Sequence, residues 1–126
     1  MQQDHRCLIR DHEVADVPEL TFRHPLNPKS EVSLRSLSAL AGLQRIGLHI
    51  GRLSPGAESF VYHYHHCESV GHHLRNPFPA DLVYLMGGES REVEIGKYPR
   101  LGKRAIFEKG RDAYIVDLDA TQPFLR

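Results

Sequence analysis

Apolar residues alternate with polar or small residues at every second position in the middle of this 126-residue chain. Ile46, Leu48 and Ile50 form the clearest run, because a single glycine or histidine separates each from the next. Side chains of a β-strand point alternately to opposite faces, so a period of two predicts a strand with one buried face. This pattern indicates that the chain forms β-sheets rather than a helical bundle.

Further apolar stretches follow turn signals along the second half of the chain. Turns are predicted at residues 54–56 and 76–81, because proline fixes one backbone dihedral and glycine accepts a positive one. The predicted strands cover residues 44–51, 60–66, 82–86, 91–95, 103–108 and 113–118, and the last two form a hairpin. Six short strands with little helix indicate an all-β sandwich or barrel.

Residues 1–41 lack this regular alternation. We predict an irregular N-terminal arm over residues 1–41, followed by a β domain over residues 42–126. Two prolines within residues 25–28 remove backbone donors and favour an extended path. Apolar residues within 31–41 lie at near-helical spacing, but the run is short and rich in serine, so a weak helix and a loop are both compatible with it.

The charge balance and the cysteine content limit the classes of partner and compartment. Lysine plus arginine and aspartate plus glutamate number 16 each, so we expect no nucleic-acid partner and no anionic membrane partner. Cys7 and Cys67 are too few for a disulfide framework and favour a reducing compartment. The polar N-terminal residues are unlike a secretory signal, and no apolar run reaches membrane-spanning length. We therefore expect a cytoplasmic protein.

Five of the nine histidines lie within eleven residues, between positions 63 and 73. Neutral imidazole is the commonest protein ligand for divalent transition metals. His63 and His65 lie two positions apart in a predicted strand, so their side chains point to the same face, about 7 Å apart along the backbone. This arrangement predicts a metal site. A solvated histidine-rich loop, or core histidines bonded to their neighbours, is the alternative interpretation.

Two spacings within this cluster resemble the motifs of the cupin family, small β-barrels that hold a metal inside. The first motif, a glycine followed by H-x-H, is matched by Gly56 and residues 63–65, and the second, H-x-x-x-N, by residues 72–76. The likeness extends over roughly residues 42–90. It implies a jelly-roll barrel, also called a double-stranded β-helix, around a divalent transition metal (Fe, Mn, Ni or Zn). The implied imidazole ligands are His63, His65 and His72.

Only six residues separate His65 from His72, whereas a cupin normally places several strands between its two motifs. The glutamate expected three or four positions after the H-x-H is replaced by other residue types, so Glu68 and Cys67 are the candidates to complete the metal shell. A barrel that lacks strands exposes unpaired backbone groups at its edges. We therefore expect a barrel that is incomplete in one chain and is completed by a homodimer.

The resemblance implies a metal-dependent isomerase or oxygenase that acts on a small-molecule substrate. Three histidine ligands would leave positions open for water or substrate, which is typical of a reactive metal site. Arg45, Arg52 and Arg75 are candidates for holding an anionic substrate, although single arginines at strand ends are usually solvated. The missing glutamate and strands favour an alternative, a non-enzymatic degenerate cupin that binds a small ligand or serves as an oligomerisation module. Likeness of fold does not decide between them.

Overall fold

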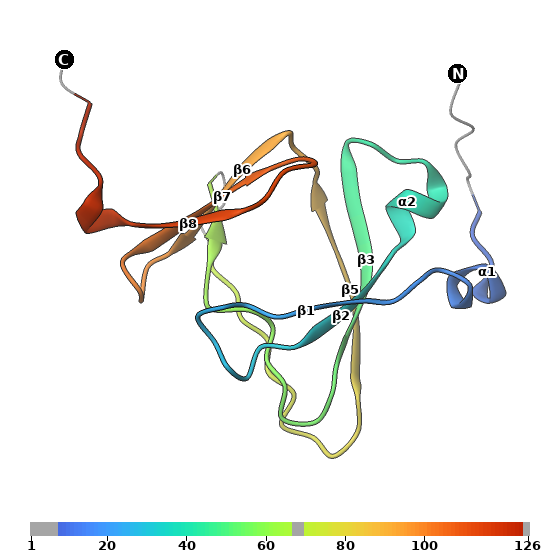
Figure 1. Cartoon of the computed structure of the whole chain (residues 1–126). Helices are drawn as coiled ribbons and strands as arrows, with labels where there is room; N and C mark the ends of the chain where they lie inside the picture. The colour runs from blue at the N-terminus through green and yellow to red at the C-terminus, as the bar shows by residue number, and fades with distance from the viewer. Residues whose placement is uncertain (1–7, 67–69, 125–126) are drawn as a thin grey trace. The chain divides into compact units, whose positions relative to one another are not determined.

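The computed structural model describes residues 8–66 and 70–124. The chain divides into two compact units, Met1–Phe60 with Leu74–Ser90 and Val61–His73 with Arg91–Arg126. Each unit contains one four-stranded antiparallel sheet (Figure 1). The helices in the described residues are short: α1 Asp11–Ala15, α2 Leu37–Ala41 and the 3-10 helix η1 Leu118–Ala120. The prediction of an all-β chain is therefore confirmed.

The sheet of the first unit has the strand order β1-β2-β3-β5. Its strands are β1 Leu20–Phe22, β2 Val32–Ser36, β3 Ile46–Leu53 and β5 Leu82–Glu89. β3 is the strand predicted from the alternating pattern, and it pairs with β5 along its whole length, from Ile46 opposite Glu89 to Leu53 opposite Leu82. β5 extends past the predicted end at Met86 because its two glycines continue the ladder with β3.

β1 and β2 lie within residues 1–41, where the sequence predicted an irregular arm. β2 contributes to the buried interior, since Val32 is only 1% exposed. The alternation that would have revealed this strand is absent, because Val32 and the neighbouring Ser33 are both buried. Pairing with β1 on one side and β3 on the other holds this segment extended. Within the predicted arm, residues 20–22 and 32–36 therefore form strands of the first sheet.

The short helix considered for residues 31–41 is present as α2, but it covers only the second half of that segment. The Ser36 side chain accepts a hydrogen bond of 3.2 Å from the Ala39 backbone N–H, which caps the start of the helix. Gly42 has a φ of 72° and ends it, because glycine adopts the left-handed conformation without a Cβ clash.

A group of charged side chains connects β1 and its preceding residues to the rest of the first sheet. Arg35 on β2 donates to the backbone carbonyls of Ala15 (3.0 Å) and Val17 (2.7 Å). Arg52 on β3 donates to Glu19 through Nη2 (2.5 Å) and Nε (3.1 Å). Its Nη1 also lies 3.2 Å from an Asp81 carboxylate oxygen. Arg52, one of the arginines considered for an anionic substrate, is thus paired with carboxylates of its own unit.

Replacement of Glu19 with Gln tests this ion-pair group through its pH dependence. The hydrogen bond from Arg52 lowers the pKa of Glu19 below its usual value of 4.5. A lowered carboxyl pKa in the folded state stabilises the fold above the unfolded pKa, and this contribution disappears as the pH falls through the folded pKa. We expect Glu19→Gln to reduce the free energy of unfolding by about 1 kcal/mol or less at neutral pH, with a smaller difference in acid.

Urea denaturation at several pH values measures this difference. Glu31→Gln is the matched control, because Glu31 pairs with Arg23 at the surface and both side chains are more exposed than those of Glu19 and Arg52. A Glu19→Gln effect that stays constant or grows as the pH falls through the lowered pKa of Glu19 would contradict the assignment, because protonation of the carboxyl removes its ion pair with Arg52.

The sheet of the second unit has the strand order β4-β6-β7-β8 (Figure 1). Its strands are β4 Tyr64–His65, β6 Val93–Tyr98, β7 Lys103–Glu108 and β8 Tyr114–Asp117. β7 and β8 pair as the predicted hairpin, whereas β4 is much shorter than the strand predicted over residues 60–66. Val61, Tyr98 and Ala105 form the buried core of this unit, with Ile115 packed against them.

The described residues contain eight strands, two more than the sequence predicted. The additional strands are β1 and β2, so each sheet has four strands despite the short spacing between His65 and His72. The homodimer expected from missing strands stays a prediction. Within the described ranges, no helix has the length and apolar character to cross a membrane.

Candidate metal centre

Three of the clustered histidines lie on two neighbouring backbone segments of the second unit. His65 is on β4, opposite Gly96 of β6. His63 and His72 face one another as an antiparallel bridge, in which His72 N–H donates to His63 O (2.8 Å) and His63 N–H donates to His72 O (3.3 Å). This reversal of the chain places the second histidine motif beside the first.

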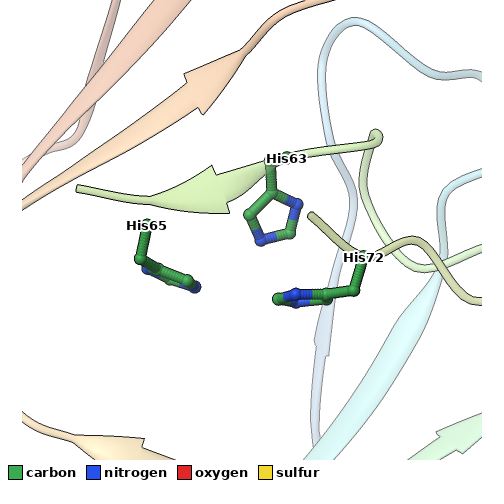
Figure 2. A group of neighbouring side chains, drawn as sticks. All are labelled: His63, His65 and His72. Carbon is green, nitrogen blue, oxygen red and sulfur yellow. The ribbon is translucent and has the colours of Figure 1, made fainter. Parts of the chain in front are cut away.

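The three imidazoles predicted as ligands, His63, His65 and His72, come together. One ring nitrogen from each lies within 4.8 Å of the others. The ring centroid of His63 lies 5.3 Å from that of His65 and 4.5 Å from that of His72. Figure 2 shows the three rings turned toward a common space. His63 and His65 are half-buried, whereas His72 is exposed.

The separation of these nitrogens fits a shared divalent ion. With metal–nitrogen bonds of about 2.1 Å, three evenly spaced ligand atoms of one ion lie at most about 3.6 Å apart. Movement of each nitrogen by less than an ångström toward the common centre is therefore sufficient to bring all three to bonding distance. An all-imidazole donor set suits zinc, copper, iron and nickel.

A hydrogen bond to the backbone sets the orientation of His63. Its Nδ1 lies 2.7 Å from the carbonyl oxygen of Val61. A carbonyl oxygen only accepts, so Nδ1 carries the proton and donates it, and Nε2 is the nitrogen that carries the lone pair. Such a contact on the far nitrogen is typical of metal-binding histidines, because it fixes both the tautomer and the ring orientation.

The sheet beside the histidines provides one small residue and one aromatic residue. Gly96 has no side chain opposite His65, and the nearest atoms to a Cβ built there belong to Phe107 at 3.4 Å and Tyr98 at 3.7 Å. The Tyr98 ring is nearly fully buried and packs edge-on to His63, with centroids 6.2 Å apart. Burial raises the pKa of Tyr98, so its hydroxyl remains protonated at neutral pH.

Close packing of Tyr62 on Gly71 supports the reversal between the two motifs. A Cβ added at Gly71 would lie 2.5 Å from the Tyr62 ring, so this position accepts only glycine unless the ring moves. The Arg100 guanidinium covers the Tyr62 ring at 4.0 Å from its centroid, an interaction of a cation with an aromatic face. These contacts hold the Gly71 backbone next to the segment that carries His63.

The other residues considered for the metal shell are not placed at this centre. Cys67 and Glu68, the candidates to complete it, lie outside the described residues, as does Cys7. His66 and His73 are described, but neither belongs to the group whose ligand atoms converge.

Asn76, the last residue of the second motif, has a structural position in the first unit. It is fully buried, at 0% exposure. Its Nδ2 donates to the carbonyls of Leu53 (2.9 Å) and Ala80 (2.8 Å), and its Oδ1 accepts from the Phe78 N–H (3.0 Å). The asparagine therefore holds together the turn that the sequence predicted over residues 76–81.

Glu94 lies next to the histidine group and was not identified from the sequence. Its Oε1 is 3.9 Å from Nδ1 of His65. The alternating charged and aliphatic residues around position 94 indicated only a strand with one solvated face. The pairing of β4 with β6 brings Glu94 to His65, and this pairing joins residues more than thirty positions apart in sequence.

Comparisons with known proteins identify two solved structures with the same fold. No protein-family model matches the chain, and no curated protein sequence matches it. A candidate sugar phosphate isomerase from Acidithiobacillus ferrooxidans has a TM-score of 0.80 at 22% identity, covering 94% of this chain and 97% of that chain. A sugar phosphate isomerase from a cupin superfamily, from Silicibacter pomeroyi, has a TM-score of 0.67 at 16% identity, covering 87% and 94%.

At these identities the likeness establishes the fold and leaves the chemistry to the site residues. The structural similarity to the two neighbours covers most of this chain, in which antiparallel sheets predominate and the described helices are few. The chain therefore has an all-β, cupin-like fold, as the sequence predicted.

Proposed function

We propose that this chain holds a divalent transition metal on His63, His65 and His72 and isomerises a small phosphorylated sugar. The observation that carries the proposal is the convergence of three imidazole nitrogens within 4.8 Å. Both structural neighbours are described as sugar phosphate isomerases, one of them as a candidate, which favours isomerisation over oxygenation.

The residues of the site suit a substrate that reaches the centre from solvent. His72 is exposed, so one side of the histidine group is accessible to solvent. On the other side, Nδ1 of His63 is hydrogen-bonded to the Val61 carbonyl. A divalent ion bound to the three imidazoles would polarise a carbonyl or hydroxyl oxygen of the sugar. Conversion of an aldose to a ketose moves one hydrogen from C2 to C1 and one from the C2 hydroxyl to the oxygen on C1, and it leaves the overall composition unchanged.

Metal analysis followed by hydrogen exchange tests the proposal. Untagged protein is stripped with a chelator, reloaded separately with Mn²⁺, Fe²⁺, Ni²⁺ or Zn²⁺, and incubated in D₂O with pentose and hexose phosphates. We expect deuterium to enter the carbon next to the carbonyl, and a ketose to form, only with the reloaded protein. The measurement is proton NMR of the sugar, which detects exchange even where net conversion is small.

The metal centre and the isomerase activity can be contradicted independently of one another. Protein that binds metal tightly but exchanges no hydrogen with any sugar phosphate would contradict the isomerase assignment and favour the non-enzymatic ligand-binding module. Protein that retains no metal under any of the four conditions would contradict the metal centre itself.

A further inference from the structure

The Glu94 carboxylate is held in a defined position beside the histidine group. Its Oε1 accepts hydrogen bonds from the backbone N–H groups of His66 and Ile95, both at 3.1 Å. The side chain is 22% exposed, so it lies largely against the protein. Two backbone donors on one oxygen restrict rotation of the carboxylate and keep it close to β4.

His65 presents Nδ1 to this carboxylate, at 3.9 Å from Oε1. That separation exceeds the upper limit for an N–H···O hydrogen bond, about 3.2 Å, by less than an ångström. A small rotation of the imidazole closes it, and such contacts commonly shorten when a ligand is bound. Figure 2 shows the His65 ring directed toward the space shared with His63 and His72.

The arrangement at His65 parallels that at His63. His63 donates from Nδ1 to a backbone carbonyl, so Nε2 is the nitrogen that carries the lone pair. A carboxylate also only accepts, so a proton on Nδ1 of His65 is favoured by Glu94, and Nε2 keeps its lone pair. Two of the three imidazoles would then present the same nitrogen to one centre.

We propose that Glu94 is a positioning residue for the metal centre, selecting the Nδ1-protonated tautomer of His65 and holding its ring for coordination through Nε2. This inference rests on the proposed function for its role in metal binding. Glu94 acts here through His65, since the converging ligand atoms belong to the three histidines. Carboxylate partners of metal-bound imidazoles fix the tautomer and raise the basicity of the ligand.

The tautomer of His65 in metal-free protein tests the inference without any metal. We would record ¹⁵N chemical shifts of the imidazole nitrogens at about pH 8, above the usual histidine pKa of about 6.5. In the parent protein we expect a protonated Nδ1 and an unprotonated Nε2 for His65. Glu94→Ala should remove this preference, while Glu94→Gln, whose amide oxygen still accepts, should preserve part of it. A parent His65 protonated at Nε2, or a tautomer unchanged in Glu94→Ala, would overturn the inference.

Metal affinity provides the second measurement, by competition with a chromogenic chelator. Loss of such a carboxylate partner weakens metal binding by about 10-fold to 100-fold, and we expect a loss in this range for Glu94→Ala and a smaller one for Glu94→Gln. Glu92→Ala is the matched control, because Glu92 is 84% exposed and lies near Lys109 rather than the histidines. Equal metal affinity in the parent and in Glu94→Ala would refute the positioning role of Glu94. It would not contradict the metal centre itself.

The two proposals remain distinguishable. A parent protein without metal affinity refutes the proposed function, while the tautomer measurement still decides whether Glu94 orients His65. If Glu94→Ala does not fold, Glu94→Gln serves instead, because its side chain retains the acceptor for both backbone N–H groups. If the His65 tautomer and the metal affinity of Glu94→Gln are both identical to those of the parent, the proposed role of the Glu94 carboxylate is contradicted.

Discussion

We expect His63→Ala to lower the affinity for a divalent transition metal by more than about 100-fold, because His63 is a proposed ligand and loss of a residue that only orients a ligand already weakens binding by about 10-fold to 100-fold. The His63 ring lies nearer to each of the other two rings than those rings lie to one another, their centroids being 6.0 Å apart. Removal of His63 therefore leaves the His65 and His72 imidazoles without the ring that lies nearest to both. Chelator competition and elemental analysis of untagged protein measure the effect.

Thermal unfolding with and without added metal gives an independent measure of the same loss. A ligand that binds only the folded state raises the unfolding temperature, by an amount set by its concentration relative to Kd. We expect Zn²⁺ to raise the unfolding temperature of the parent protein and to leave that of His63→Ala nearly unchanged. His66→Ala is the control, because His66 is exposed and outside the converging group. Equal losses in both variants would point to diffuse histidine binding rather than a defined centre.

Asn76→Ala should cause the largest loss of stability among the substitutions considered. The substitution removes two donated hydrogen bonds and one accepted bond at a fully buried position. The bond to the Leu53 carbonyl is buried, and those to Ala80 and Phe78 are partly buried. A buried group left without its partner costs about 1–3 kcal/mol, so we expect a total loss of about 2 kcal/mol or more. Native domains are stable by only about 5–15 kcal/mol, which makes this a large fraction.

Urea denaturation measures this loss as a lower midpoint at constant slope. Asn76→Asp should also destabilise, because it replaces the amide donor with an oxygen that faces the carbonyls of Leu53 and Ala80. Phe78→Ala is the control in the same turn. The Phe78 side chain is 62% exposed and its backbone N–H is retained, so its loss should change stability by less than about 0.5 kcal/mol. An Asn76→Ala midpoint equal to that of the parent would show that the turn forms without these bonds.

The strands that were predicted correctly are those with a local signal. β3 has an alternating pattern, and β7 and β8 are separated by a short polar link, so neighbouring residues suffice to identify them. β1 and β2 have no such signal. β1 is only three residues long, and β2 buries two consecutive residues, so pairing with β3 rather than local preference stabilises them.

Part of the candidate site could be predicted from spacing in the same way. His63 and His65 share a face because they are two residues apart in an extended segment, and the H-x-x-x-N resemblance added His72. Glu94 could not be found by this route. Its approach to His65 depends on the register between β4 and β6, and a shift of one residue would point the Glu94 side chain to the opposite face.

The sequence by itself determined the preference for strands over helices and the shared orientation of the first two histidines, because both follow from the geometry of an extended backbone. The tertiary structure decided that His72 lies opposite His63, that residues 20–22 and 32–36 join a sheet, and that a carboxylate from β6 approaches β4. These features depend on hydrogen bonds between residues distant in sequence, which become favourable only after the intervening chain has been brought together.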